Sequence, residues 1–174
     1  MQKPFMMYMV GLSGSGKTTI ANALKERLKE QGMNNIQILD GDILRSQFGG
    51  IFGYTYEERM KANQAARVVA EYLIQNGISV ILTQVAAYEE MRSKTREHFG
   101  EHYIEVYVKC SYEECARRDV KNYYKKYNEG KMKNLNGADD VYEIPLNSHI
   151  IIDTERETVD EGVNKIIQYL QEYK

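Results

Sequence analysis

The segment Gly11-Leu12-Ser13-Gly14-Ser15-Gly16-Lys17-Thr18 constrains this chain more than any other feature of its sequence. It follows an apolar run, residues 6–10, and precedes apolar residues at helical spacing, so it joins an expected strand to an expected helix. Glycines in such a turn let backbone amides point inward and bind an anion at the helix N-terminus. Lys17 would reach the outer phosphates, and Thr18 would supply its hydroxyl to Mg²⁺. The segment predicts binding of a nucleoside triphosphate through Gly11, Ser13, Gly14, Ser15, Gly16, Lys17, Thr18 and Thr19.

Apolar runs and amphipathic stretches alternate along the rest of the chain. The expected strands are residues 6–10, 35–39, 78–82, 103–109 and 149–152. The expected helices are residues 17–29, 57–76 and 89–98, with two more opened by Ser111 and Thr158. Continuously apolar strands need cover on both faces, so this alternation predicts an α/β fold of three layers, with a five-stranded parallel sheet flanked by helices. A chain of 174 residues without a linker or repeat is expected to be one domain, residues 1–174.

Three expected helix starts carry a Ser or Thr followed three residues later by Glu. In this pattern the hydroxyl and the carboxylate satisfy each other's unpaired backbone amides. The three pairs are Thr55 with Glu58, Ser111 with Glu114, and Thr158 with Glu161. In the helix that Thr55 opens, the apolar spacing predicts an inward stripe of Ala65, Val68, Val69, Tyr72 and Leu73.

Composition and charge narrow the possible partners. Basic and acidic residues nearly balance, with a formal net charge of −2, so the whole molecule offers no attraction to a polyphosphate and no nucleic-acid partner is expected. No stretch is long and apolar enough for a membrane span or a secretion signal. We therefore expect a cytoplasmic protein with no membrane partner.

One segment interrupts the alternation. Residues 117–133 hold seven basic side chains against two acidic ones, together with three tyrosines. A solvated charged helix would explain this composition. Beside a phosphate-binding loop, a second explanation is a mobile cationic lid, at about residues 117–140, that closes over the transferring phosphates and excludes water.

Two carboxylates follow the second expected strand, at the edge where open parallel sheets bind their ligands. Asp40 and Asp42 could there hold metal-bound water or accept the proton of an attacking hydroxyl group, although a simple Asp-Gly-Asp turn also fits. Their spacing leaves open which one serves Mg²⁺ and which one serves the acceptor. Arg45 and Arg59 follow on the same side and suit an anionic second substrate.

Taken together, these motifs resemble the adenylylsulfate kinase family, whose members phosphorylate the 3'-hydroxyl of adenosine 5'-phosphosulfate. The resemblance rests on residues 11–19, 39–42, 45, 53–59, 118–121, 124–126 and 133–139. It implies a P-loop nucleotide-kinase fold, MgATP as the phosphoryl donor and a possible homodimer. It also implies that Asp42 lies near the acceptor hydroxyl and Arg118 close to ATP. With the lysine of the loop, the expected catalytic set is Lys17, Asp42 and Arg118, and the expected Mg²⁺ ligands are Thr18 and Asp40, with the choice between the two carboxylates still open.

The acceptor half departs from the family pattern. The family's Ile-Ser-Pro-aromatic run is Val85-Ala86-Ala87-Tyr88 here, its asparagine after the matched arginine is Ala62, and its stacking aromatic on the lid is Leu135. Tyr54 could supply the opposite ring. Because a lost hydrogen-bonding partner shifts substrate preference strongly, these departures bear on the identity of the acceptor. The expected acceptor site comprises Asp40, Asp42, Arg45, Tyr54, Arg59, Asn63, Val85, Lys121, Lys133 and Leu135.

The leading functional hypothesis is an ATP-dependent kinase of the 3'-hydroxyl of adenosine 5'-phosphosulfate. An alternative is a paralogous kinase of another small nucleotide, such as a cytidine diphosphoramidate in capsular polysaccharide modification. A GTPase-like switch is a weaker hypothesis, because Asn164-Lys165 is followed by Ile166-Ile167 and no Asn-Lys-x-Asp run occurs. A non-enzymatic nucleotide-binding or RNA-binding module is the remaining alternative.

Overall fold

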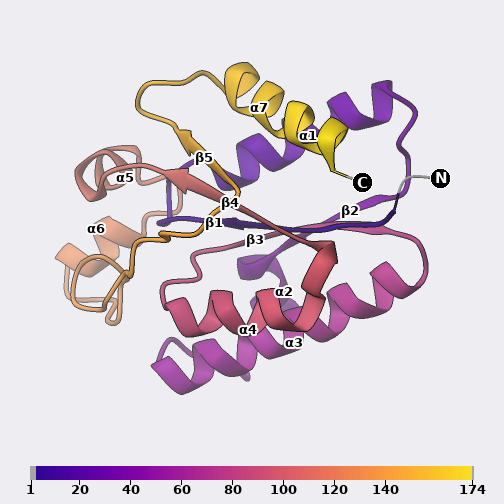
Figure 1. The fold of residues 1–174 in the computed structure, drawn as a ribbon. Helices are drawn as coiled ribbons and strands as arrows, with labels where there is room; N and C mark the ends of the chain where they lie inside the picture. Colours follow the sequence, from indigo (N-terminus) through magenta and orange to yellow (C-terminus); the bar gives the residue numbers. More distant parts are fainter. Residues whose placement is uncertain (1–2, 174) are drawn as a thin grey trace.

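The computed structural model describes residues 3–173 as one parallel sheet covered by helices (Figure 1). The five strands lie in the order β2-β3-β1-β4-β5, and all neighbouring pairs are parallel. Their bounds are β1 (Met6–Val10), β2 (Ile36–Asp40), β3 (Ser79–Gln84), β4 (Tyr103–Lys109) and β5 (Ile150–Asp153). The predicted sheet is confirmed.

Helices cover both faces of this sheet. In Figure 1, α1 and α7 lie on one face, α2, α3 and α4 lie on the other, and α5 and α6 lie beyond the carboxyl ends of the strands. Their bounds are α1 (Lys17–Glu30), α2 (Gly41–Gln47), α3 (Tyr56–Gln75), α4 (Glu89–Phe99), α5 (Tyr112–Arg118), α6 (Tyr123–Asn128) and α7 (Val159–Glu172), with a short 3₁₀ turn at Gly100–His102. The predicted three layers are therefore present.

The central strand explains why the sheet is buried on both sides. All five residues of β1 are fully buried, because alternate side chains enter two separate cores. Met7 and Met9 pack in the core beneath α1 and α7, whereas Met6, Tyr8 and Val10 pack in the core beneath α3. Among residues 3–173, no helix is long and apolar enough to cross a lipid bilayer.

The predicted inward stripe of α3 is correct only in part: Val69 and Leu73 are half-buried and pack against the core beneath α3. The buried residues of α3 are Arg59, Asn63, Ala66, Ala70 and Ile74. Two of the predicted residues face outward instead, since Val68 is 43% and Tyr72 is 65% exposed. The small alanines let α3 lie close to the sheet, and this gain outweighs the burial of the larger side chains on the neighbouring stripe.

The helix starts bear out the capping pattern in two places of three. Thr55 and Thr158 each exchange hydrogen bonds with the Glu three residues later. Ser111 also accepts from the Glu114 amide, but its own amide donates to Glu155 at 2.6 Å, because Arg117 and Arg118 hold the Glu114 carboxylate. The helix α2 was not expected: Asp40 ends β2 and caps this helix, so Asp40-Gly41-Asp42 is a strand-to-helix junction rather than a plain turn.

Candidate active site

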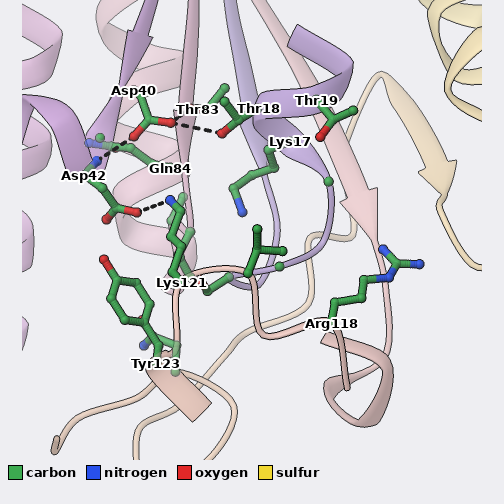
Figure 2. Close-up of a pocket in the computed structure, with 18 of the residues that line it drawn as sticks. Lys17, Thr18, Thr19, Asp40, Asp42, Thr83, Gln84, Arg118, Lys121 and Tyr123 are labelled. Atoms are coloured by element: carbon green, nitrogen blue, oxygen red, sulfur yellow. Dashed lines mark hydrogen bonds and ion pairs between the residues drawn. The ribbon is translucent and has the colours of Figure 1, made fainter. Parts of the chain in front are cut away.

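The carboxyl ends of the strands open into a cavity of about 450 Å³. The glycine-rich loop, α2, the end of β3, residues 118–136 and the segment after β5 all contribute to its lining. Figure 2 shows the side chains that converge on it from these elements. The strand register determines this convergence, since Asp40 lies opposite Thr83, and Val10, next to the loop, lies opposite Gln84.

The loop between β1 and α1 has the backbone that an anion-binding nest requires. Gly16 caps α1 with φ 103°, a conformation that side chains disfavour. Gly11 has φ 152°, and a side-chain carbon at this position would collide with the Val108 carbonyl oxygen. Lys17 Nζ donates to the carbonyl oxygens of Gly11 and Leu12, both at 2.7 Å. The ammonium group is therefore held at the mouth of the loop.

Lys17 is buried, and its environment disfavours its charged form. Burial, together with the positive charge of Lys121, lowers the pKa of Lys17 to about 8, against the opposing effect of Asp42. A bound polyphosphate would stabilise the charged ammonium group. The site thus holds an unbalanced positive charge that an anionic ligand can neutralise.

Asp40 connects β2 to the phosphate-binding loop. Its Oδ1 accepts from the backbone amide of Asp42 at 2.9 Å, while its Oδ2 accepts from Thr18 Oγ1 at 3.0 Å and Thr83 Oγ1 at 3.2 Å. Burial raises the pKa of Asp40, but the charge of Lys121 and these hydrogen bonds outweigh burial and leave the pKa below its ordinary value. Asp40 and Thr18 thus bring a carboxylate oxygen and a hydroxyl oxygen together, and both are of the type that Mg²⁺ prefers.

Asp42 faces a different partner. It lies in the first turn of α2 and makes an ion pair with Lys121, which comes from the segment between α5 and α6 (Figure 2). Burial lowers the pKa of Lys121, but Asp42 and Asp40 raise it above its ordinary value. The spacing in the sequence could not distinguish these two carboxylates, but the structure does. Asp40 lies on the Thr18 side and Asp42 lies on the Lys121 side.

An arginine pair surrounds one aromatic ring of the cavity. The guanidinium carbons of Arg45 and Arg59 lie 4.7 Å and 5.4 Å from the centre of the Tyr54 ring. Arg59 also donates to the Asn134 carbonyl oxygen at 2.5 Å and lies 3.5 Å from the Asp140 carboxylate. Arg59 therefore contacts the far end of the segment 117–140, in addition to lining the cavity.

Arg118 and the pair of Asp42 and Lys121 lie on opposite sides of the phosphate-binding loop (Figure 2). The Arg118 guanidinium donates to the hydroxyl and carbonyl oxygens of Thr154 at 3.0 Å and 2.9 Å, and to Glu114 at 2.8 Å. Thr154 in turn donates to the Ser15 carbonyl oxygen at 2.9 Å. Arg118 is thus held beside the phosphate-binding loop, where residues 157–159 complete the cavity wall.

Most residues expected at the site line this cavity. The lining includes Ser13, Gly14, Gly16, Lys17, Thr18, Thr19, Asp40, Asp42, Arg45, Tyr54, Arg59, Val85, Arg118, Lys121 and Leu135. Two expected acceptor residues lie elsewhere: Asn63 is fully buried beneath the cavity wall, and Lys133 is exposed outside the lining. Gly11 and Ser15 belong to the phosphate-binding loop but lie on its side away from the cavity.

Sequence reasoning missed several side chains of the lining, among them Thr83, Gln84, Tyr123 and Thr154. Thr83, Gln84 and Thr154 end or follow strands of the parallel sheet, so the rule that pointed to Asp40 could have found them. Tyr123 carries no such signal, because only the packing of α6 against the rest of the molecule brings it into the cavity.

A glycine-rich anion nest with Lys-Thr, a carboxylate beside that threonine and a basic segment across the cavity define a kinase of the P-loop class. Residues 3–153 match the family described as Adenylylsulphate kinase. The chain therefore belongs to the adenylylsulfate kinase family.

Individual relatives agree over nearly the whole chain. The adenylyl-sulfate kinase of Halothermothrix orenii is 40% identical over 171 residues, which cover 98% of this chain and 91% of the relative. That of Pseudomonas aeruginosa is also 40% identical over 171 residues, covering 98% and 87%. The solved structure of the Mycobacterium tuberculosis APS kinase in complex with AMPPNP and APS has 26% identity, a TM-score of 0.91 and coverage of 98% and 99%.

Proposed function

We propose that this chain transfers the γ-phosphoryl group of ATP, with Mg²⁺, to the 3'-hydroxyl of adenosine 5'-phosphosulfate. The observation that carries this proposal is that one cavity holds both Lys17 of the phosphate-binding loop and the carboxylate of Asp42. Thr18 donates its hydrogen bond to Asp40, so Asp42 is left to act on the acceptor. Membership of the adenylylsulfate kinase family supports the choice of acceptor.

The donor half of the mechanism follows from the loop. Its amides and Lys17 bind the β- and γ-phosphates, and Arg118 stabilises charge on the transferring group. Thr18 and Asp40 would hold Mg²⁺, and the fit is good because their hydroxyl and carboxylate oxygens already lie 3.0 Å apart beside the nest. When bound, Mg²⁺ neutralises negative charge on the phosphate oxygens.

The acceptor half centres on Asp42. Its carboxylate takes the proton of the 3'-hydroxyl group as the oxygen forms its bond to the γ-phosphorus and the bond from that phosphorus to the ADP oxygen breaks. Lys121, which pairs with Asp42 here, would exchange this partner for the phosphoryl oxygens. Arg45, Arg59 and Tyr54 would bind the anionic nucleotide from the opposite wall.

The test is ADP release from MgATP by the purified protein, with product mass, for adenosine 5'-phosphosulfate and a panel of adenosine, cytidine and uridine nucleotides. Saturable turnover of the phosphosulfate is expected. Transfer only to a different nucleotide would keep the kinase mechanism and reject this acceptor, as the alternative with a cytidine diphosphoramidate requires. Ala86 and the buried Leu135 motivate that arm of the panel.

We further propose a homodimer that contacts through the outer face of α3, where Val68 and Tyr72 are exposed. We also propose a cytoplasmic protein without a nucleic-acid partner, since its formal net charge of −2 gives the whole molecule no attraction to a polyphosphate. Light scattering measures the molecular mass and so tests the homodimer. An RNA-binding titration tests the absence of a nucleic-acid partner.

A further inference from the structure

Gln84, the last residue of β3, lies in the cavity wall between the two halves of the site. Its Oε1 accepts two hydrogen bonds from beneath the cavity, from the Tyr8 hydroxyl at 2.7 Å and from Asn63 Nδ2 at 3.1 Å. Tyr8 and Asn63 are both fully buried. The amide of Gln84 is thereby anchored on its oxygen side.

The network also fixes which way this amide points. Asn63 Nδ2 donates a second hydrogen bond to the Tyr8 oxygen at 2.9 Å, so the single Tyr8 proton goes to Gln84. Within this network of described residues, only Asn63 Oδ1 is left without a partner. Turning both amides round would instead leave the N–H groups of Asn63 unpaired in the interior, and unpaired buried N–H groups are rarer than unpaired carbonyl oxygens.

The nitrogen of Gln84 therefore remains available to a ligand. Within residues 3–173, Gln84 accepts hydrogen bonds but donates none from its side chain. Its Nε2 lies against Gly41, where an added side-chain carbon would come within 3.3 Å of it, and Gly41 precedes Asp42 (Figure 2). An oriented donor thus stands on the Asp42 side of the cavity.

We propose that Gln84 is a specificity-determining residue whose amide donates to an oxygen or an unprotonated ring nitrogen of the acceptor nucleotide. Because its own oxygen is occupied, it binds an atom with a lone pair and disfavours an amino group at the same place. This inference rests on the proposed function, since it takes the occupant of this half of the cavity to be the phosphoryl acceptor.

The test measures KM for adenosine 5'-phosphosulfate and for ATP in Gln84→Leu and Gln84→Met. The loss of one neutral hydrogen bond should raise the acceptor KM roughly three- to tenfold, while the ATP KM stays within about twofold. Gln37→Leu, which replaces an exposed glutamine of β2 outside the cavity, is the matched control and should leave both values unchanged.

Two further variants separate ligand contact from a structural role. Gln84→Glu keeps both interior hydrogen bonds but presents an anionic oxygen to an anionic acceptor, so its acceptor KM should rise more than that of Gln84→Leu. A purely structural role predicts the reverse order, because Glu keeps the interior bonds and Leu loses them. Tyr8→Phe removes one anchor and should raise the acceptor KM by a smaller factor, with an unchanged ATP KM.

Equal acceptor KM values in wild type and Gln84→Leu, or a smaller rise in Gln84→Glu than in Gln84→Leu, would overturn this inference while the proposed function stands. Absence of transfer to the phosphosulfate by the wild type, with transfer to another nucleotide, would overturn the proposed function instead. The same KM ratios would then be measured with that nucleotide.

Discussion

At the scale of single residues, the site assigns different tasks to chemically identical groups by their neighbours. Asp40 accepts from Thr18 and Thr83, whereas Asp42, two residues later, pairs with Lys121. Their environments differ because a strand end and the first turn of a helix point their side chains in different directions. Substitutions of either carboxylate should therefore have different kinetic effects.

Asp42→Asn should lower kcat by about 10²- to 10⁴-fold, the usual contribution of a general base. The affinity for ATP should change far less, because the loop amides and Lys17, which bind the phosphates, keep their positions. Single-turnover transfer and equilibrium ATP binding measure the two effects separately. Asp160→Asn, at an exposed position on α7, is the control. Normal turnover in Asp42→Asn would show that another group accepts the proton.

The depressed pKa of Lys17 predicts a pH dependence of ATP binding. Burial and Lys121 lower this pKa to about 8, so the uncharged amine becomes the major free form as pH rises through that value. Bound phosphate favours the charged form, so ATP affinity should fall above about pH 8, by up to roughly tenfold per pH unit. Binding there should also take up a proton, which calorimetry in buffers of different ionisation enthalpy detects. A constant Kd across this pH range, from well below to well above the Lys17 pKa, would contradict this assignment.

At the scale of elements, a buried carboxylate joins helix α4 to the sheet far from the cavity. Glu105 of β4 is fully buried and accepts from Arg96 at 3.0 Å, from Ser148 at 2.8 Å and from Tyr103. Its backbone amide donates to His149 Nδ1 at 2.9 Å, next to β5. This network fixes the packing of α4 and the entry to the edge strand.

Glu105→Ala should lower the free energy of unfolding by about 3 kcal/mol, because it leaves several polar groups unpaired in the interior. Glu105→Gln should cost less, since its amide oxygen can still accept. Urea unfolding at neutral pH measures both values. Glu101→Ala is the control, because the Glu101 side chain is exposed and solvent screens its ion pair with Lys3, so stability should stay close to that of the wild type. Equal stability of Glu105→Ala and wild type would show that this network does not stabilise the fold.

At the scale of the whole molecule, several contacts hold the segment 117–140 over the site. Among them are the ion pair of Lys121 with Asp42 and the contacts of Arg59 with Asn134 and Asp140. On the outer surface, the exposed Val68 and Tyr72 of α3 form the face that we propose for the homodimer. These two regions lie on different sides of α3, so assembly and the covering of the site can be tested independently.

Tyr72→Glu should convert the proposed homodimer into monomers, because it places a charge in an apolar contact. Light scattering after gel filtration, over a range of protein concentrations, measures the mass directly. Gln168→Glu on α7 adds the same charge on the opposite face of the sheet and should leave the mass unchanged. A wild-type mass equal to one chain of 20.2 kDa at every concentration would reject the dimer.

The site could be predicted in part, because some of it is formed by residues that are contiguous in the sequence. The Gly11–Thr18 loop needs only contiguous residues, and its neighbours Met6–Val10 and Lys17–Glu30 formed the predicted strand and helix. The exact orientation of α3 could not be predicted. Ala66 and Ala70 face the sheet because their small side chains let the helix pack closely, and the spacing of apolar residues carries no information about packing distance.

The sequence by itself determined the alternating parallel fold and the phosphate-binding chemistry, since both follow from hydrophobic period and from the backbone freedom of glycines at set spacing. Only the tertiary structure decided that Asp40 lies on the Thr18 side, that Asn63 lies below the cavity, and that the side-chain oxygen of Gln84 is held by buried partners. The physical reason is that each of these outcomes depends on partners that are distant in the chain, and neighbouring strands and packed side chains bring them together only in the folded molecule.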